Sequence, residues 1–93
     1  MYARVVRFTG TNEETVERVK ARIDEGGPPP GVRATSMKML FDADQGTALF
    51  VAFFATEQDL RDADPVFQQM DRGDTPGDRA SVDLCEVVIE REA

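Results

Sequence analysis

The sequence predicts one α+β domain, in which two helices cover one face of an antiparallel four-stranded sheet. Three observations lead to this fold class. Four segments that favour strands alternate with two amphipathic segments in the order β-α-β-β-α-β. The second and third strand segments are separated only by the turn-forming run "DADQG", which makes them a hairpin. The 93 residues suffice for a single domain over residues 1–93, and the connections give the strand order 4-1-3-2.

The first strand and the first helix follow from local patterns. The run "YARVVRF" at residues 2–8 is rich in the β-branched and aromatic residues that favour strands. Thr11 and Glu14 have the spacing of a capping box, so a helix is expected to begin at Thr11. Its buried face is predicted to consist of three residues at helical spacing, Val16, Val19 and Ile23. The run "GGPPPG" at residues 26–31 ends the helix, because proline cannot continue it.

A hairpin is predicted at residues 32–55. Strands over residues 32–41 and 47–55 flank "DADQG", in which Gly46 is expected to supply a positive φ. This run resembles the start of a calcium loop, but it lacks the spacing and the distant glutamate of such a loop. A turn is therefore predicted there, and no metal site.

The second half of the chain repeats the pattern of helix and strand. Thr56 and Asp59 have capping spacing. Pro65 is predicted to interrupt the helix that follows, either as two short pieces, with Asp64 capping the second, or as a kink. Residues 71–78 are predicted to form a loop, and residues 81–89 the last strand, before a solvated tail. The buried face of the second helix is predicted to carry Leu60, Ala63, Phe67 and Met70.

The composition limits the class of partner. The chain has 11 Lys and Arg against 18 Asp and Glu, a net charge of −7, so this acidic protein is expected to bind neither nucleic acid nor an anionic membrane surface. No apolar run approaches the roughly 20 residues of a membrane span. The first residues lack the pattern of a signal peptide, and a single cysteine, Cys85, allows no intrachain disulfide. We therefore expect a cytoplasmic protein.

The third strand segment is apolar on both of its faces. Every residue from 48 to 55 is apolar, whereas a strand with one solvated face alternates apolar with polar residues. The helices can cover only one face, so a second copy of the chain is expected to cover the other, which predicts a homodimer through the sheet face. Part of this apolar surface can also line a ligand pocket, and the two arrangements can coexist.

The residue types available limit the possible chemistry. Histidine is absent, so no Ser-His or Cys-His pair can form, and Cys85 is predicted to be a core residue. We expect no cofactor. Four residues are candidates for a catalytic role, namely Tyr2, Arg4, Arg7 and Asn12, although Asn12 lies at a predicted helix start where a capping role is expected. A second set is predicted to line an apolar pocket or to fill the core: Met37, Met39, Phe50, Phe53, Phe54, Phe67 and Met70.

The two arginines of the first strand lie on its opposite faces. At least one of Arg4 and Arg7 is expected to be buried, and a buried arginine needs a carboxylate partner. Asp83 or Glu86, on the neighbouring last strand, is the predicted partner. The pair would tie the strands or the two protomers together, or an arginine would reach a cavity and bind an anionic or enolate oxygen.

Several segments together resemble one protein family. They are "MYARVVRF", "PPGV", "LFDADQGTALFVAFFATEQDLRDAD" and the closing "VDLCEVVIE". The pattern resembles the antibiotic-biosynthesis-monooxygenase-like domains of the dimeric α/β-barrel superfamily. This resemblance implies a ferredoxin-like protomer and a barrel made by two sheets, with the helices outside. Family members include cofactor-free monooxygenases that act on aromatic polyketides, and haem-degrading enzymes; the missing histidine ligand does not fit the latter.

Three functions are compatible with these observations. The first is a small homodimer that binds an apolar or aromatic ligand, or stabilises a partner, without catalysis. The second is a cofactor-independent monooxygenase, in which the carbanion of an aromatic polyketide-like substrate itself activates oxygen. The third is isomerisation or lyase chemistry on a small acid. A cavity between sheet and helices that holds an inward polar group favours the enzymes, whereas a solid layer excludes them.

Overall fold

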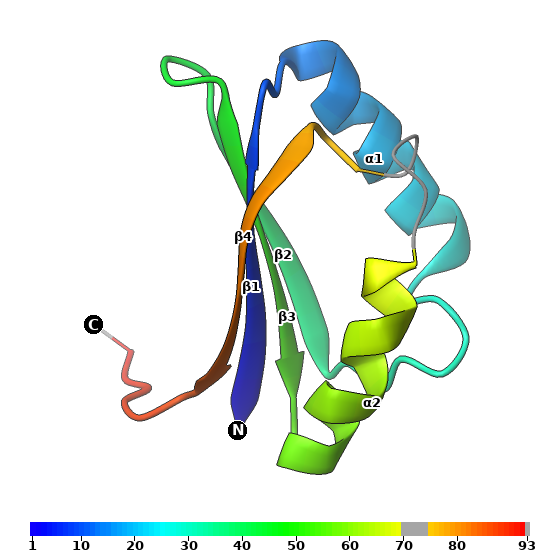
Figure 1. The fold of residues 1–93 in the computed structure, drawn as a ribbon, viewed down its shortest axis with the longest axis vertical. Coiled ribbons are helices and arrows are strands. Elements are labelled where there is room, and N and C mark those ends of the chain that lie inside the picture. Colours follow the sequence, from blue (N-terminus) through cyan, green and yellow to red (C-terminus); the bar gives the residue numbers. More distant parts are fainter. Residues whose placement is uncertain (70–74, 93) are drawn as a thin grey trace.

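The computed structural model describes residues 1–69 and 75–92, which form a sheet layer and a helical layer (Figure 1). The α+β class, the antiparallel four-stranded sheet and the two helices are as predicted. The elements follow in the order β1 (Tyr2–Thr9), α1 (Glu13–Gly26), β2 (Ser36–Asp42), β3 (Thr47–Phe54), α2 (Glu57–Gln68) and β4 (Asp78–Glu86). Within the described ranges, no helix is long and apolar enough to cross a membrane.

The sheet has the strand order β2-β3-β1-β4, and each neighbouring pair is antiparallel. In its register Val5 of β1 lies between Val51 of β3 and Asp83 of β4. Both helices lie on one side of the sheet (Figure 1), which we call the helix side, and the opposite side is the open face. Because side chains alternate along a strand, every second residue of β1 and β3 points to each side.

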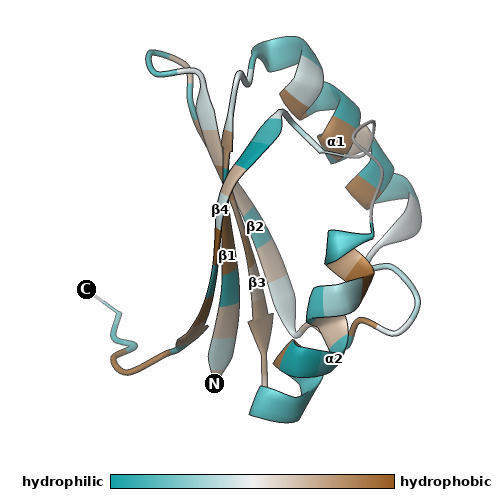
Figure 2. Ribbon diagram, viewed as in Figure 1, coloured by the Kyte–Doolittle hydropathy of each residue, from teal (hydrophilic) through white to brown (hydrophobic). Residues whose placement is uncertain are grey.

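The two helices pack against the sheet to different extents. The main core lies beneath α2, where Leu60, Ala63 and Phe67 meet Ala52 and Phe54 of β3. The buried face predicted for this helix is thus confirmed, except at Met70, which lies outside the described residues. The contacts of α2 with β1 and β3 are more extensive than any that α1 makes with the sheet. The apolar side of α1 faces the sheet (Figure 2), but Val19 is the one residue of this helix that is buried.

The hairpin turn between β2 and β3 forms as predicted. Gly46 has a φ of 65°, which other residues rarely adopt. The Asp42 carboxylate accepts hydrogen bonds from the backbone N–H groups of Asp44 and Gln45 and from the Gln45 side chain. The carbonyl of Gly46 also accepts from the N–H of Thr11 at 2.9 Å, so the turn is tied to the connection between β1 and α1.

The predicted start of α1 at Thr11 was wrong. Asn12 is the N-cap: its side chain accepts from the N–H of Thr15, and the Thr15 hydroxyl accepts from the N–H of Asn12. Thr11 cannot take this position, because its backbone N–H is held by the hairpin and its side chain is buried. At the second helix, the predicted N-cap is confirmed, since Thr56 Oγ1 accepts from the N–H of Asp59.

The prediction that Pro65 divides the second helix into two pieces was also wrong. The helix α2 runs through Pro65 without a break to Gln68. Pro65 lacks one N–H and so removes one helical hydrogen bond, that to the carbonyl of Arg61, and both residues are exposed, so water can bind this carbonyl. Asp64 does not cap a new helix, because its carboxylate binds Arg4 instead.

The last strand is displaced from its predicted range. It begins at Asp78 and ends at Glu86, and Val88 and Ile89, which were expected within it, are more than four-fifths exposed in the tail. The second strand begins at Ser36 and not at Val32, which packs into the core from the preceding loop. Cys85 was expected in the core but is exposed, because it lies on an edge strand.

Candidate functional site

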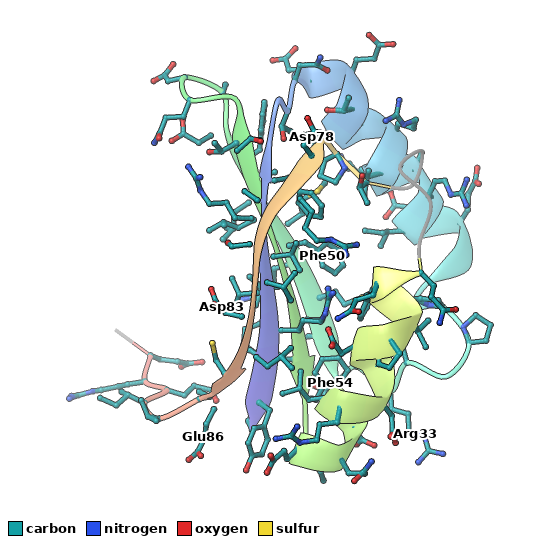
Figure 3. All side chains as sticks on the ribbon, viewed as in Figure 1. Arg33, Phe50, Phe54, Asp78, Asp83 and Glu86 are labelled. Atoms are coloured by element: carbon teal, nitrogen blue, oxygen red, sulfur yellow. The ribbon has the colours of Figure 1, made fainter. Side chains whose placement is uncertain are left out.

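A cavity of about 320 Å³ lies between the sheet and α1. Residues from all four strands form its floor, including Val6 and Phe8 of β1, Met37 of β2 and Phe50 of β3. Phe50 points from the sheet toward the helical layer, as Figure 3 shows. The opposite wall consists of Val19, Arg22 and Ile23 of α1 and the loop residues Gly26, Gly27, Pro28, Pro29 and Pro30.

The cavity exists because the two helices carry side chains of different size. Where α2 crosses the sheet, Leu60 and Phe67 fill the space down to the strands. The apolar side of α1 carries Val16, Val19 and Ile23, which are shorter and β-branched, and it makes fewer contacts with the sheet. The space left under α1 is lined mainly by apolar groups, which is typical of small-molecule sites.

Arg4 is a buried polar residue at the base of this cavity. It is 3% exposed, and its Nε donates to Asp64 Oδ1 of α2 over 2.9 Å. Its guanidinium carbon lies 4.9 Å from the ring centre of Phe67, within range of a cation–π interaction. Among the described residues the Nη2 atom of Arg4 has no hydrogen-bond partner, although it is buried.

A second arginine, Arg79 of β4, reaches the same region. It lines the cavity, and its Nη2 donates to the carbonyl of Phe67 at 3.2 Å. Burial lowers the pKa of the Arg4 guanidinium; Asp64 opposes that shift, and the positive charge of Arg79 adds to it. An arginine remains protonated at neutral pH, so both guanidinium groups carry a positive charge, and Asp64 supplies the counter-charge of Arg4.

The structure brings only one of the four candidate catalytic residues into this cavity. Arg4 lines it. Tyr2 lines a smaller pocket of about 210 Å³ at the other end of the sheet, together with Leu60 and Cys85. Arg7 is exposed on the open face, because it follows Arg4 at an odd spacing along β1, and Asn12 caps α1.

The residues predicted to line a pocket or core lie in several different places. Met37, Phe50 and Phe67 line the cavity, and Phe54 is fully buried beneath α2. Met39 is half-buried opposite Phe50 in the sheet register, without lining the cavity. Phe53 lies on the open face, where the Lys38 ammonium is 6.0 Å from its ring centre, and Met70 lies outside the described residues.

The predicted carboxylate partner of Arg4 was wrong. Asp83 lies opposite Val5 and points to the open face, away from the helices (Figure 3). Glu86 is exposed at the end of β4. Arg4 instead pairs with Asp64, sixty positions away, because it faces the helical layer and α2 crosses above it. No local pattern in the sequence indicates this pair, nor the approach of Arg79 to the cavity.

Comparisons with protein-family models and with curated proteins find no match to this chain. The structure by itself defines its class: two helices over one side of a four-stranded antiparallel sheet, with a cavity between the layers. In the described part of the chain, no group of three or more His, Cys, Asp or Glu side chains is placed to hold a metal ion. The candidate site is therefore the cavity with its arginines.

Proposed function

We propose that this protein binds a small, largely apolar molecule in the sheet–helix cavity and acts as a homodimer. The cavity carries the proposal. Its volume of about 320 Å³ lies at the lower end of the range for ligand sites, roughly 300–1,000 Å³. It is lined mainly by apolar side chains, with few polar groups, and this combination binds small molecules through burial while the polar groups fix orientation.

Two probes of nearly the same shape test the binding site, 2-naphthoate and 2-naphthamide. Titration of the ¹⁵N-labelled protein with either probe should shift the amide signals of cavity residues such as Val6 and Phe50. The variant Ile23→Trp should abolish these shifts, because the larger side chain fills the cavity from α1. Lys20→Trp places the same side chain at an exposed position of α1 and serves as the control. Shifts of the open-face residues alone would refute the proposed site.

The open face of the sheet supports the proposed homodimer. At its centre lie Val5 of β1 and Val51 and Phe53 of β3, and no helix of the described chain covers them (Figure 1). The edge strands add polar residues on this face, among them Lys38 of β2 and Asp83 of β4. An apolar centre with a polar rim is the usual anatomy of a protein–protein interface.

The exposed area agrees with this proposal. The chain exposes 6273 Å², whereas a monomer of 10.3 kDa is expected to expose about 5,400 Å². The excess of roughly 900 Å² is close to the approximately 800 Å² that each partner buries in a standard interface. Two protomers that pack sheet against sheet, with their helices outside, would form the dimeric α/β barrel of the family that the sequence resembles.

The second candidate function is a cofactor-independent monooxygenase of the antibiotic-biosynthesis type. The observation that favours it is the buried, positively charged Arg4 within an apolar cavity. Such a group would stabilise the enolate oxygen of a deprotonated aromatic substrate, whose carbanion then reacts with oxygen. Oxygen uptake with anthrone as the substrate tests this function, and Arg4→Met should abolish any uptake that the wild-type protein shows.

A further inference from the structure

The buried arginine of the cavity has a donor that the described residues leave unused. Arg4 is 3% exposed, and its Nη2 atom has no acceptor among them. A buried donor without an acceptor is unfavourable, and more so when it belongs to a charged group. Because Arg4 lines the cavity, an acceptor supplied from the cavity can remove this penalty.

The ion pair of Arg4 and Asp64 is held by one hydrogen bond and not by the parallel pair of bonds that would also satisfy this donor. A carboxylate that binds a guanidinium through two parallel hydrogen bonds uses both of its oxygens. Here Oδ1 of Asp64 accepts from Nε of Arg4 at 2.9 Å, whereas Oδ2 accepts from the side-chain amide of Gln68 at 2.9 Å. Asp64 therefore meets Arg4 through the single hydrogen bond from Nε, and Nη2 of Arg4 has no acceptor among the described residues.

The charged side chains that line the cavity in the described part of the chain are all arginines. The charged residues that line it are Arg4, Arg22 and Arg79, and none of the described lining residues is an Asp or a Glu. This contrasts with the whole chain, whose net charge is −7. The local positive charge of Arg4 and Arg79 favours a negatively charged ligand at this end of the cavity, whereas the net charge of the chain opposes the approach of anions from a distance.

The rest of the lining determines the body of the ligand. The rings of Phe50 and Phe67 meet edge to face, with centres 6.0 Å apart, and both line the cavity. Val6 and Met37 complete this apolar floor. An aromatic or alicyclic body packs well against such a surface.

We propose that the ligand is a small apolar carboxylic acid in its ionised form, whose carboxylate accepts a hydrogen bond from Nη2 of Arg4 while its ring packs against Phe50 and Phe67. Arg79 adds positive charge at the same end of the cavity. This inference rests on the proposed function and extends it, because it specifies the charge and the orientation of the ligand.

The same two probes test the inference by comparison of their affinities. 2-Naphthoate carries the carboxylate, and 2-naphthamide replaces it with a neutral amide. We expect the naphthoate to bind roughly tenfold to a hundredfold more tightly, which is the usual effect of one hydrogen bond to a charged group. Dissociation constants come from the NMR titrations, in which the shifted signals also locate each probe.

Three variants separate the effect of the arginines from that of net charge. Arg4→Met should reduce the preference for the naphthoate to about one or below. Arg79→Met, at an exposed position, should reduce it about twofold to fivefold, because screening weakens the contribution of this charge. Arg33→Met removes the same charge from an exposed loop residue beyond α2 (Figure 3) and should leave the preference unchanged.

The outcomes distinguish the inference from the function on which it rests. If both probes bind in the cavity of the wild-type protein with equal affinity, the proposed function stands and the carboxylate inference is overturned. If neither probe shifts the signals of cavity residues, the proposed function fails and the inference fails with it. If Arg4→Met does not fold, the affinities of the wild-type protein and of Arg79→Met for the two probes provide the test. Equal affinities of the wild-type protein for both probes, together with an unchanged affinity ratio in Arg79→Met, then refute the inference.

Discussion

Arg4 and Asp64 form an ion pair whose two partners lie in different environments. The arginine side chain is 3% exposed, and the aspartate side chain is 19% exposed. Asp64 also keeps a hydrogen bond from Gln68, whereas Arg4 has Asp64 as its single hydrogen-bond partner within the described ranges. The loss of one partner therefore has different consequences for the two residues, because a buried charge without a counter-charge is much less stable than a partly hydrated one.

At the residue scale we expect Asp64→Ala to be more destabilising than Arg4→Met. The first change leaves a buried guanidinium without its carboxylate and should lower the free energy of unfolding by about 3 kcal/mol. The second leaves a partly hydrated carboxylate and should cost about 1 kcal/mol. Urea unfolding at one fixed protein concentration measures both. An Arg4→Met variant that loses as much stability as Asp64→Ala would contradict this account.

At the scale of elements, the unequal packing of the two helices creates the site. The helix α2 fills its half of the layer with Leu60 and Phe67, whereas α1 buries only Val19 and leaves the cavity beneath it. The loop after α1 and the segment before β4 close the space at the edges. That segment reaches the sheet at Gly77, which lies against Thr9 and Thr11 at the end of β1.

The element-scale prediction concerns Gly77. A Cβ atom there would overlap the backbone carbonyl oxygen of Thr9 and lie 3.0 Å from Thr11 Oγ1. Because backbone atoms cannot move aside easily, Gly77→Ala should lower the free energy of unfolding by about 2–3 kcal/mol. Gly26→Ala is the matched control, since a Cβ at this helical position meets nothing within 4 Å and should raise stability by up to about 1 kcal/mol. Equal effects of the two changes in urea unfolding would count against this packing.

At the scale of the whole molecule, the two sides of the sheet have different roles. The helix side provides the core and the cavity, and the open face presents apolar side chains of β1 and β3 to solvent in the isolated chain. Figure 2 shows β3 as apolar along its length, although only alternate residues reach the core. The proposed homodimer would bury the others and also shield Cys85, which is exposed in the single chain.

Sedimentation equilibrium tests the assembly. We expect a mass of twice 10.3 kDa at micromolar concentration for the wild-type protein. Val51→Asp places a charge at the centre of the open face and should yield the mass of one chain. Ala21→Asp adds the same charge on the exposed side of α1 and should leave the dimer intact. Circular dichroism verifies that each variant is folded, and a wild-type mass of a single chain would refute the dimer.

The sequence predicted those parts of the fold that depend on local patterns. The strand-forming runs, the helical spacing of Leu60, Ala63 and Phe67 and the Gly46 turn each depend on residues close together in the chain. The same alternation identified Met37 and Phe50, which line the cavity, as pocket or core residues. The errors lie at positions where a distant contact decides: Asn12 rather than Thr11 caps α1, because the hairpin holds Thr11.

The candidate site was less accessible to sequence reasoning. The sequence indicated that at least one of Arg4 and Arg7 is buried, since both occupy a central strand, but it did not indicate which one, and it named neither Asp64 nor Arg79 as a neighbour. The pair spans sixty positions and depends on where α2 crosses the sheet. One sequence signal for the cavity was overlooked. The apolar side of α1 carries short β-branched residues, whereas that of α2 carries the larger Leu60 and Phe67.

The sequence by itself thus determined the order and type of the elements, the apolar character of both faces of β3 and the absence of histidine chemistry. Only the tertiary structure decided that Arg4 faces the helices, that Asp64 neutralises it through one oxygen, and that space remains beside it. The physical reason is the range of the interactions. Secondary structure follows from neighbours within a few residues, whereas a cavity and its charges arise from surfaces that meet only when the layers pack.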